Sequence, residues 1–146
     1  MKKKLLVINF IVIALSLAAV FGVGVAATVG SNSRSAENTV KNYAAIYAES
    51  YSSGVDVTKN VPENVRVTVI DGDADFTVLA DSEDSSLVGK PHTDRAEIEN
   101  AINGSDKAVV RNSVSLGKKM VYFAVKTTKR DGATAFVRVA VPVESI

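Results

Sequence analysis

The N-terminal part of the chain differs from the rest in its pattern of hydrophobic and polar positions. Lys2, Lys3 and Lys4 precede a stretch from Leu5 to Val29 that carries no charged side chain. As a helix, this stretch of about 25 residues would be roughly 37 Å long, which exceeds a hydrocarbon core of about 30 Å. The pattern therefore predicts a transmembrane helix.

The basic residues at the start of the chain are compatible with a membrane anchor and with a cleaved secretory signal. A cleaved secretory signal also begins with basic residues, but its apolar region is usually only about 7 to 15 residues long. Length favours an uncleaved anchor, and a signal removed near Ala26 and Ala27 is the alternative. Three lysines before the span, against Arg34 after it, place the N-terminus in the cytoplasm. We expect a single-pass protein of the cell membrane with residues 31–146 extracytoplasmic.

A second helical pattern, from Ser31 to Ser53, would continue the span. Its apolar positions recur at steps of three and four residues, and they are Val40, Tyr43, Ala44, Tyr47 and Tyr51. This stripe can pack on the domain's own sheet or pair with its copy in a homodimer, and both can hold along one helix. The predicted organisation is a cytoplasmic tip and anchor over 1–30, a juxtamembrane helix over 31–54 and a domain over 55–146.

Beyond residue 54 the hydrophobic period changes from helical to two. Val65, Val67 and Val69 alternate with polar residues, which predicts a strand over 65–70. The same reasoning predicts strands over 76–80, 107–114, 119–127 and 134–141. Two strands, a helix and three further strands are typical of an α+β sheet domain.

The single predicted helix inside this domain begins at a capping box. Asp94 is followed three residues later by Glu97, the spacing with which a side chain caps the first turn of a helix. The helix would bury Ile98, Ala101 and Ile102 on one side and stop at Gly104.

Composition excludes several classes of function. The net charge of +1 offers no general attraction to nucleic acid, and the absence of cysteine removes thiolate zinc sites, iron–sulfur clusters and cysteine nucleophiles. The run Asp71, Asp73, Asp75 imitates half of a calcium loop, but Phe76 and Ser82 stand where the glycine and the acidic ligand should be. No motif for nucleotide binding or nucleophilic hydrolysis appears. We expect no metal and no cofactor.

Four polar residues are candidate ligand-binding residues. Arg111, Tyr122 and Arg138 each lie in an otherwise apolar predicted strand. An arginine there either extends to the sheet edge and solvent, or faces a pocket that captures a carboxylate or phosphate. His92, in the polar segment 81–93, has no evident catalytic partner and is expected to order its loop by a hydrogen bond. If a small anion binds, this segment should cover the sheet, with all four side chains converging beneath it.

Several short motifs, taken in order, resemble the extracytoplasmic sensor domain of PhoR-like two-component histidine kinases. They are VRVTVIDGD, VLADS, HTDRAEI, VRNSVSLGKKMVYFAV and VRVAVPVESI. The resemblance implies a PAS-like fold of the PDC or Cache type, in which a long N-terminal helix lies behind a five-stranded antiparallel sheet. We expect the strand order 2-1-5-4-3, with strand 65–70 beside strand 134–141 and the helix of residues 38–53 on one face.

The resemblance also sets the expected function. In such bacterial kinases the sensor domain is followed by a second span, a cytoplasmic relay, the phosphoacceptor helix and an ATP-binding domain, and none of these lies within the 146 residues. The chain would thus be the signal-sensing input portion, either an N-terminal fragment of such a kinase or a free-standing single-pass sensor relic, without enzymatic activity of its own. Its expected partners are the lipid bilayer, a second copy, and a small anionic ligand or a cell-envelope partner, without nucleic acid. The alternative is a membrane-tethered structural or interaction domain with no signalling output.

Overall fold

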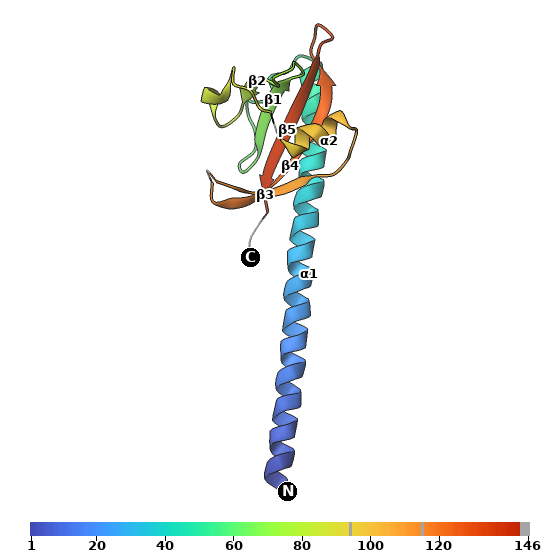
Figure 1. Ribbon diagram of the computed structural model, residues 1–146, viewed down its shortest axis with the longest axis vertical. Coiled ribbons are helices and arrows are strands. Elements are labelled where there is room, and N and C mark those ends of the chain that lie inside the picture. Colours follow the sequence, from blue (N-terminus) through green and yellow to red (C-terminus); the bar gives the residue numbers. More distant parts are fainter. Residues whose placement is uncertain (94, 115, 144–146) are drawn as a thin grey trace.

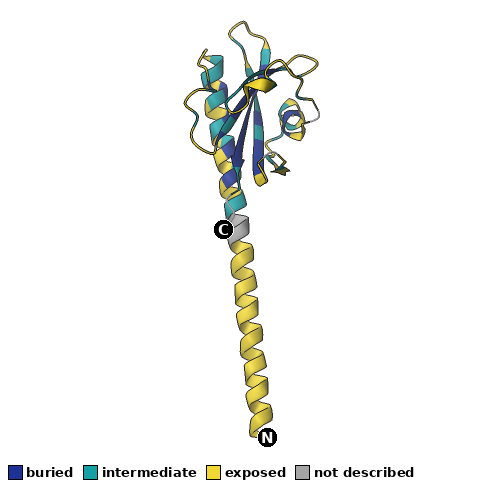
Figure 2. Cartoon of the chain, turned by 90° about the vertical axis from the view of Figure 1, so that its left-hand side faces the viewer, coloured by how far each residue is buried: buried dark blue, intermediate teal, exposed yellow. Residues whose placement is uncertain are grey.

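One long helix carries the whole domain. In the computed structural model, which describes residues 1–93, 95–114 and 116–143 (for 28–31 the backbone alone), α1 runs unbroken over Lys2–Ser52. Its N-terminal half stands clear of the domain, and its C-terminal half packs against a sheet (Figure 1). The apolar residues of the free half are exposed along its length (Figure 2). This half is long and apolar enough to span a membrane.

The sheet has five antiparallel strands in the order β2-β1-β5-β4-β3. The strands are β1 Arg66–Asp71, β2 Val78–Asp81, β3 Val109–Ser113, β4 Lys118–Thr128 and β5 Thr134–Pro142. Between β2 and β3 lie the short 3₁₀ helix η1 Ser85–Leu87 and the helix α2 Ala96–Ile102. The predicted α+β class and strand order are confirmed, and β1 pairs with β5 as expected.

The contact between α1 and the sheet is built from small and β-branched side chains. Ala36, Val40, Ala44 and Ala48 follow one another at four-residue steps along α1, and all are buried. They meet the alternating valines of the central strands, which are Val67, Val69, Val121, Val137, Val139 and Val141. Because alanine carries only a methyl group, the helix backbone can approach the sheet closely, and the Thr127 hydroxyl donates a hydrogen bond of 2.9 Å to the Ala48 carbonyl.

The predicted apolar stripe on α1 therefore serves the local core. Val40 and Ala44 have no exposed surface, while Tyr43 and Tyr47 are partly buried beside them with their rings stacked at 5.8 Å. A second copy of the chain cannot reach Val40, so a homodimer would have to use another face of the helix.

The start of the second strand differs from the predicted one because turn geometry determines it. The second strand was expected from Phe76 but begins at Val78. Phe76 has a φ of 49°, and the Asp73 carboxylate accepts hydrogen bonds from the Thr77 amide and hydroxyl, which closes a turn there.

The second helix also begins and ends differently. α2 starts at Ala96 after Arg95, whereas the predicted cap Asp94 lies outside the described residues. Ile98 is buried as expected, but Ile102 is largely exposed and the helix ends there, two residues before Gly104.

The alanine ladder of α1 gives a direct test of this packing. Replacing Ala44 with leucine should overfill the buried contact and lower the free energy of unfolding by about 1 to 3 kcal/mol. The matched control, Ala45→Leu, adds the same side chain one position further along α1, where the surface is exposed, and should change stability by less than about 0.5 kcal/mol. Urea unfolding of the full chain in detergent, followed by circular dichroism, measures both, and equal effects would contradict the observed orientation of α1.

Candidate functional site

The face of the sheet opposite α1 is polar at its centre. Thr68 on β1, Arg138 on β5 and Ala124 on β4 are cross-strand neighbours on this face. Helix α2 lies over β4 and β5 on the same side, away from α1 (Figure 2). The small Ala124 beside Arg138 leaves room for the guanidinium group to turn toward α2.

A buried carboxylate from α2 occupies the centre of this polar cluster. Both oxygens of Glu97 accept hydrogen bonds from Arg111, at 2.7 Å from Nη1 and 2.8 Å from Nη2. Arg138 Nη1 donates a third, at 3.2 Å. The Glu97 side chain has no exposed surface. Two arginines that clamp one carboxylate form a strong charge-assisted arrangement.

Glu97 was expected to cap the helix, and the structure assigns it a different role. It lies in the first turn of α2 but points into the protein toward Arg111 and Arg138. The arginines are on β3 and β5, so this single carboxylate ties α2 to two strands.

Tyr122 lies beneath both guanidinium groups. The ring centroid is 3.8 Å from Arg111 Cζ and 5.3 Å from Arg138 Cζ. Both distances fall within the range of cation–π attraction. The tyrosine thus provides a flat, electron-rich surface that fixes the planes in which the arginines present their donors.

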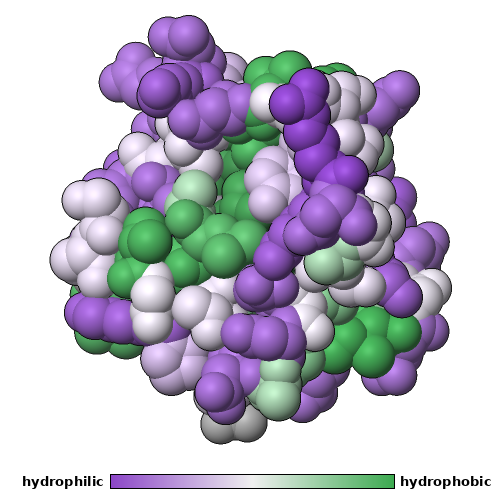
Figure 3. Space-filling view, turned by 90° about the horizontal axis from the view of Figure 1, so that it is seen from above, coloured by the Kyte–Doolittle hydropathy of each residue, from purple (hydrophilic) through white to green (hydrophobic). Residues whose placement is uncertain are grey.

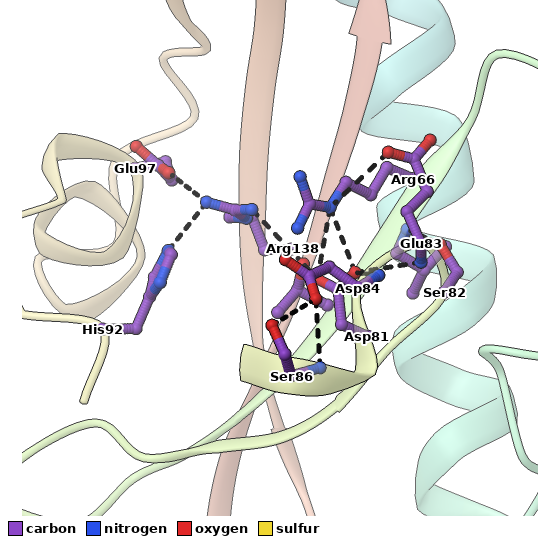
Figure 4. Close-up of polar contacts among 11 residues, drawn as sticks. Arg66, Asp81, Ser82, Glu83, Asp84, Ser86, His92, Glu97 and Arg138 are labelled. Carbon is purple, nitrogen blue, oxygen red and sulfur yellow. Dashed lines mark hydrogen bonds and ion pairs between the residues drawn. The ribbon is translucent and has the colours of Figure 1, made fainter. Parts of the chain in front are cut away.

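Arg138 also joins His92 to the cluster (Figure 4), and it bonds Thr68 as well. Arg138 Nη1 lies 2.7 Å from His92 Nε2, and Nη2 lies 3.3 Å from the Thr68 hydroxyl. A guanidinium group only donates hydrogen bonds, so Nε2 must be the acceptor and the imidazole is neutral. Arg138 Nε finds no hydrogen-bond partner within the described part of the chain, although Arg138 is buried.

A second carboxylate extends the network to the edge of the sheet. The Thr68 hydroxyl, which accepts from Arg138, donates to Asp81 Oδ2 at 2.7 Å. Asp81 also accepts a hydrogen bond of 3.1 Å from Arg66 Nε and two from the backbone amides of Glu83 and Asp84 (Figure 4). A continuous path of polar contacts therefore runs from α2 across three strands to the segment that follows β2.

Burial and the surrounding charges shift the pKa values of His92 and Glu97. Burial, together with the positive charges of Arg138 and Arg95, lowers the pKa of His92 from 6.5 to about 4. Burial alone would raise the pKa of Glu97, but the hydrogen bonds from Arg111 and the charge of Arg138 outweigh it and lower this pKa to about 2. At neutral pH the cluster thus contains an ionised Glu97, a neutral His92 and two cationic arginines.

The structure brings all four predicted residues, His92, Arg111, Tyr122 and Arg138, into one cluster. Arg138 does not extend to solvent, because it is buried among its partners. Glu97 and Asp81 were missed. Glu97 had a local signal, the capping-box spacing, that favoured another role, and nothing in the sequence links Asp81 to a strand arginine.

The element that lies over the polar cluster differs from the predicted one. The segment 81–93 was predicted to lie over the sheet if an anion binds, but much of it runs along the edge strand β2. There the Val78 amide donates a hydrogen bond to the Lys90 carbonyl, and the Gly89 amide donates one to the Val78 carbonyl. Only its end, at His92, reaches the cluster. Helix α2 forms the main cover instead.

The arrangement is suited to holding a carboxylate group, since it already holds one. Its donors come from Arg111 and Arg138, and the place between them is occupied by Glu97 of the same chain. His92 Nε2 is engaged by Arg138, so it does not activate a nucleophile in this arrangement. Within the described residues, no group of three or more histidine, aspartate or glutamate side chains is arranged to hold a metal ion.

Two comparisons with known proteins found no match to the chain. The chain matches no protein-family model, and no curated protein matches it significantly. Inference about its function therefore depends on the residues and their geometry.

The clamp predicts a large effect from removing the charge of Glu97. Glu97→Gln leaves two arginines without their shared anion and should lower the free energy of unfolding by about 3 kcal/mol, as is usual when one member of a buried ion pair is removed. Glu99→Gln, on the exposed side of the same helix, should change it by less than about 0.5 kcal/mol. Chemical denaturation of both variants tests this, and a Glu97 variant as stable as the Glu99 variant would contradict the clamp.

The shifted pKa of His92 predicts a dependence of stability on pH. Because the folded protein resists protonating this histidine, the unfolded state binds more protons, and stability should fall as the pH drops from about 6.5 toward about 4. The contribution of Glu97 to stability would be lost only between about pH 4.5 and about pH 2. His92 is the chain's only histidine, so His92→Gln should abolish the decline above about pH 5. Denaturation midpoints measured from pH 7.5 to 5 in both proteins test this, and parallel declines would contradict it.

Proposed function

We propose that the chain is the extracytoplasmic sensing portion of a membrane-bound two-component histidine kinase of the PhoR-like type. The observation that carries this proposal is the continuity of α1. The same unbroken helix contains a membrane-length apolar segment and the alanine ladder buried under the sheet. A change in the domain therefore acts directly on a membrane span, without an intervening linker.

The shape of the domain supports the proposed topology. The lysines at the N-terminus favour a cytoplasmic location for that end of α1, and the sheet lies at the other end (Figure 1). The last described residue, Val143, lines the same groove as Asn32 and Ser35 of α1. The end of β5 thus returns the chain to the level where α1 leaves the membrane, as a sensor with a second span requires.

The opposite end of the domain suits an aqueous compartment. Viewed from above, its surface is mostly hydrophilic or neutral, with smaller hydrophobic groups between (Figure 3). The β4–β5 turn at this end contains exposed Arg130 and Asp131. In this proposal residues 31–146 form the extracytoplasmic part.

The fold agrees with the PAS-like type implied by the sequence motifs. That resemblance implies a long N-terminal helix behind a five-stranded antiparallel sheet. The sheet has the order β2-β1-β5-β4-β3, with α1 packed on one face and α2 on the other. In this proposal the face covered by α2 is the sensing face.

The polar cluster supplies a chemical basis for sensing an anion. A small carboxylate that displaced Glu97 would meet the same donors on Arg111 and Arg138, with His92 and Tyr122 around it. Displacement would free α2 from the sheet. The signal would thus be a change in how α2 and the strands are held together.

A homodimer would use the outer face of α1. Asn42, Ala45, Ile46 and Glu49 are exposed on the side turned away from the sheet, and Ile46 keeps 60% of its surface accessible. In this proposal the helices of two subunits meet there and continue side by side through the membrane.

One observation favours the alternative, a membrane-tethered domain without signalling output. The anion position is already filled by the buried Glu97, so the cluster is complete without a ligand. The coding sequence beyond codon 146 separates the two functions, because a second span and a phosphoacceptor helix are expected only for the kinase.

A chimeric kinase tests the sensing function. The full chain, joined after Ile146 to the second span and cytoplasmic part of a sensor kinase with a transcriptional reporter, should transmit the state of the cluster. Glu97→Gln should change reporter output by at least about fivefold, the lower end of typical coupling between sites, and Glu99→Gln should leave it unchanged. Small carboxylic acids added outside the cell should shift the output of the wild-type chimera, and Arg111→Ala should weaken that response.

The controls distinguish signalling from misfolding. Membrane amounts of each chimera are measured by immunoblot, so that a change of output caused by misfolding is recognised by a lower amount of protein. Unchanged output in Glu97→Gln at equal membrane amounts would favour the tethered domain.

A further inference from the structure

The two hairpins at the ends of β4 differ sharply in their side chains. The β4–β5 hairpin, far from the N-terminal half of α1, has the polar turn Lys129, Arg130, Asp131 and Gly132. The β3–β4 hairpin contains Val114, fully exposed, and Leu116, 47% exposed. Turns are normally built from glycine and small polar residues, so a fully exposed valine and a half-exposed leucine in this turn require another explanation.

The position of the β3–β4 hairpin along α1 suggests one. Lys118 and Lys119 at the start of β4 line a groove of about 790 Å³ together with Asn32 and Ser35 of α1. The far end of β4 lies near Ala48, whose carbonyl accepts from Thr127. Strand β4 therefore runs away from the proposed membrane, and Val114 and Leu116 precede it on the membrane side.

Helix geometry gives the approximate height of this hairpin. Asn32 is three residues beyond Val29, so it lies about 5 Å past the end of the apolar segment. The polar headgroup layer adds roughly 5 to 7 Å on each side of the hydrocarbon core. Lys118 lines the groove that extends along α1 from Asn32 to Tyr43. The β3–β4 hairpin lies at the end of the sheet nearest the free half of α1 (Figure 1), so its described residues are close to the headgroup level.

We propose that the β3–β4 hairpin is a membrane-contact element, with Val114 and Leu116 inserted among lipid headgroups and Lys118 and Lys119 binding the phosphates of anionic phospholipids. This inference rests on the proposed anchoring of α1. The contact provides lipid as a partner for the exposed apolar side chains. It also brings the lysines close to negative phosphates, and each basic residue near an anionic bilayer strengthens binding about fivefold. Glu63 lines the same groove but lies on the segment before β1, outside the hairpin.

The consequence is a second attachment of the domain to the bilayer. With α1 alone, the sheet could rotate about the helix axis relative to the membrane plane. The hairpin lies on edge strand β3, two strands away from β5, and its contact would fix that rotation. Lipid composition at the outer surface would then influence the orientation of the sheet and of the polar cluster on it.

Site-specific fluorescence on the full chain in lipid nanodiscs tests this proposal. The protein has no cysteine, so Val114→Cys, Asp131→Cys and Leu15→Cys each create a unique site for a polarity-sensitive label. Nanodiscs of phosphatidylcholine alone are compared with nanodiscs that also contain phosphatidylglycerol, and lipids with nitroxides in the headgroup or acyl chain act as quenchers. With phosphatidylglycerol present, the label at 114 should shift to shorter wavelength and be quenched from the headgroup, and the label at 131 should show neither effect.

Further variants and a soluble anion identify the source of the interaction. Lys118→Gln and Lys119→Gln should each reduce the ratio of membrane-bound to free label at 114 about fivefold, whereas Lys59→Gln, an exposed lysine elsewhere on the domain, should leave it unchanged. Inorganic phosphate in solution should not reproduce the spectral shift. A shift caused by phosphate alone, or equal quenching in both lipids, would overturn the assignment to anionic headgroups.

The label at Leu15 separates this inference from the proposed function. Quenching at 15 by acyl-chain nitroxides, with the label at 114 as exposed to water as that at 131, would overturn the hairpin contact and leave the anchor intact. An unquenched label at 15 would overturn both the anchor and the hairpin contact.

Discussion

The close approach of α1 to the sheet is the constraint on which the rest of the structure depends. Alanines at four-residue steps on the helix meet valines at two-residue steps on the strands, so the helical and strand periods coincide along one line of contact. Larger residues on the helix would hold it away from β4 and β5. The helix that leaves the domain is therefore held at a defined angle by the core itself.

The two faces of the sheet differ in the interactions that hold a helix on them. Toward α1 the strands present valine, and the contact depends on apolar burial, which is not directional. Toward α2 the contact combines an apolar cluster, in which Ile98 packs with Ile70, Ala124 and Phe136, with directed hydrogen bonds between Glu97 and the strand arginines. An apolar contact and a contact that contains buried charges thus share one set of strands.

Much of the fold follows from local patterns in the sequence, and the site follows only in part. Valines at every second position locate β1, and the charges on Arg111 and Arg138 inside apolar strands are visible without coordinates, because a buried charge needs a partner. The identity of that partner is not visible. Glu97 is 14 residues from Arg111 and 41 from Arg138, and only the strand order brings the three together. The start of β2 was misplaced because Asp73 forms a side-chain turn with Thr77 that alternation alone does not predict.

The length of α1 makes it a mechanical lever. The sheet holds the helix from Ala36 to Ala48, and roughly 48 Å of helix extends from Ala36 to the N-terminal lysines at 1.5 Å per residue. A tilt of only about 2° at the sheet would displace the N-terminal end by about 1.7 Å, a shift comparable to helix motions at regulated interfaces. The unbroken helix thus converts angular changes too small to disturb core packing into displacements that a neighbouring helix can detect.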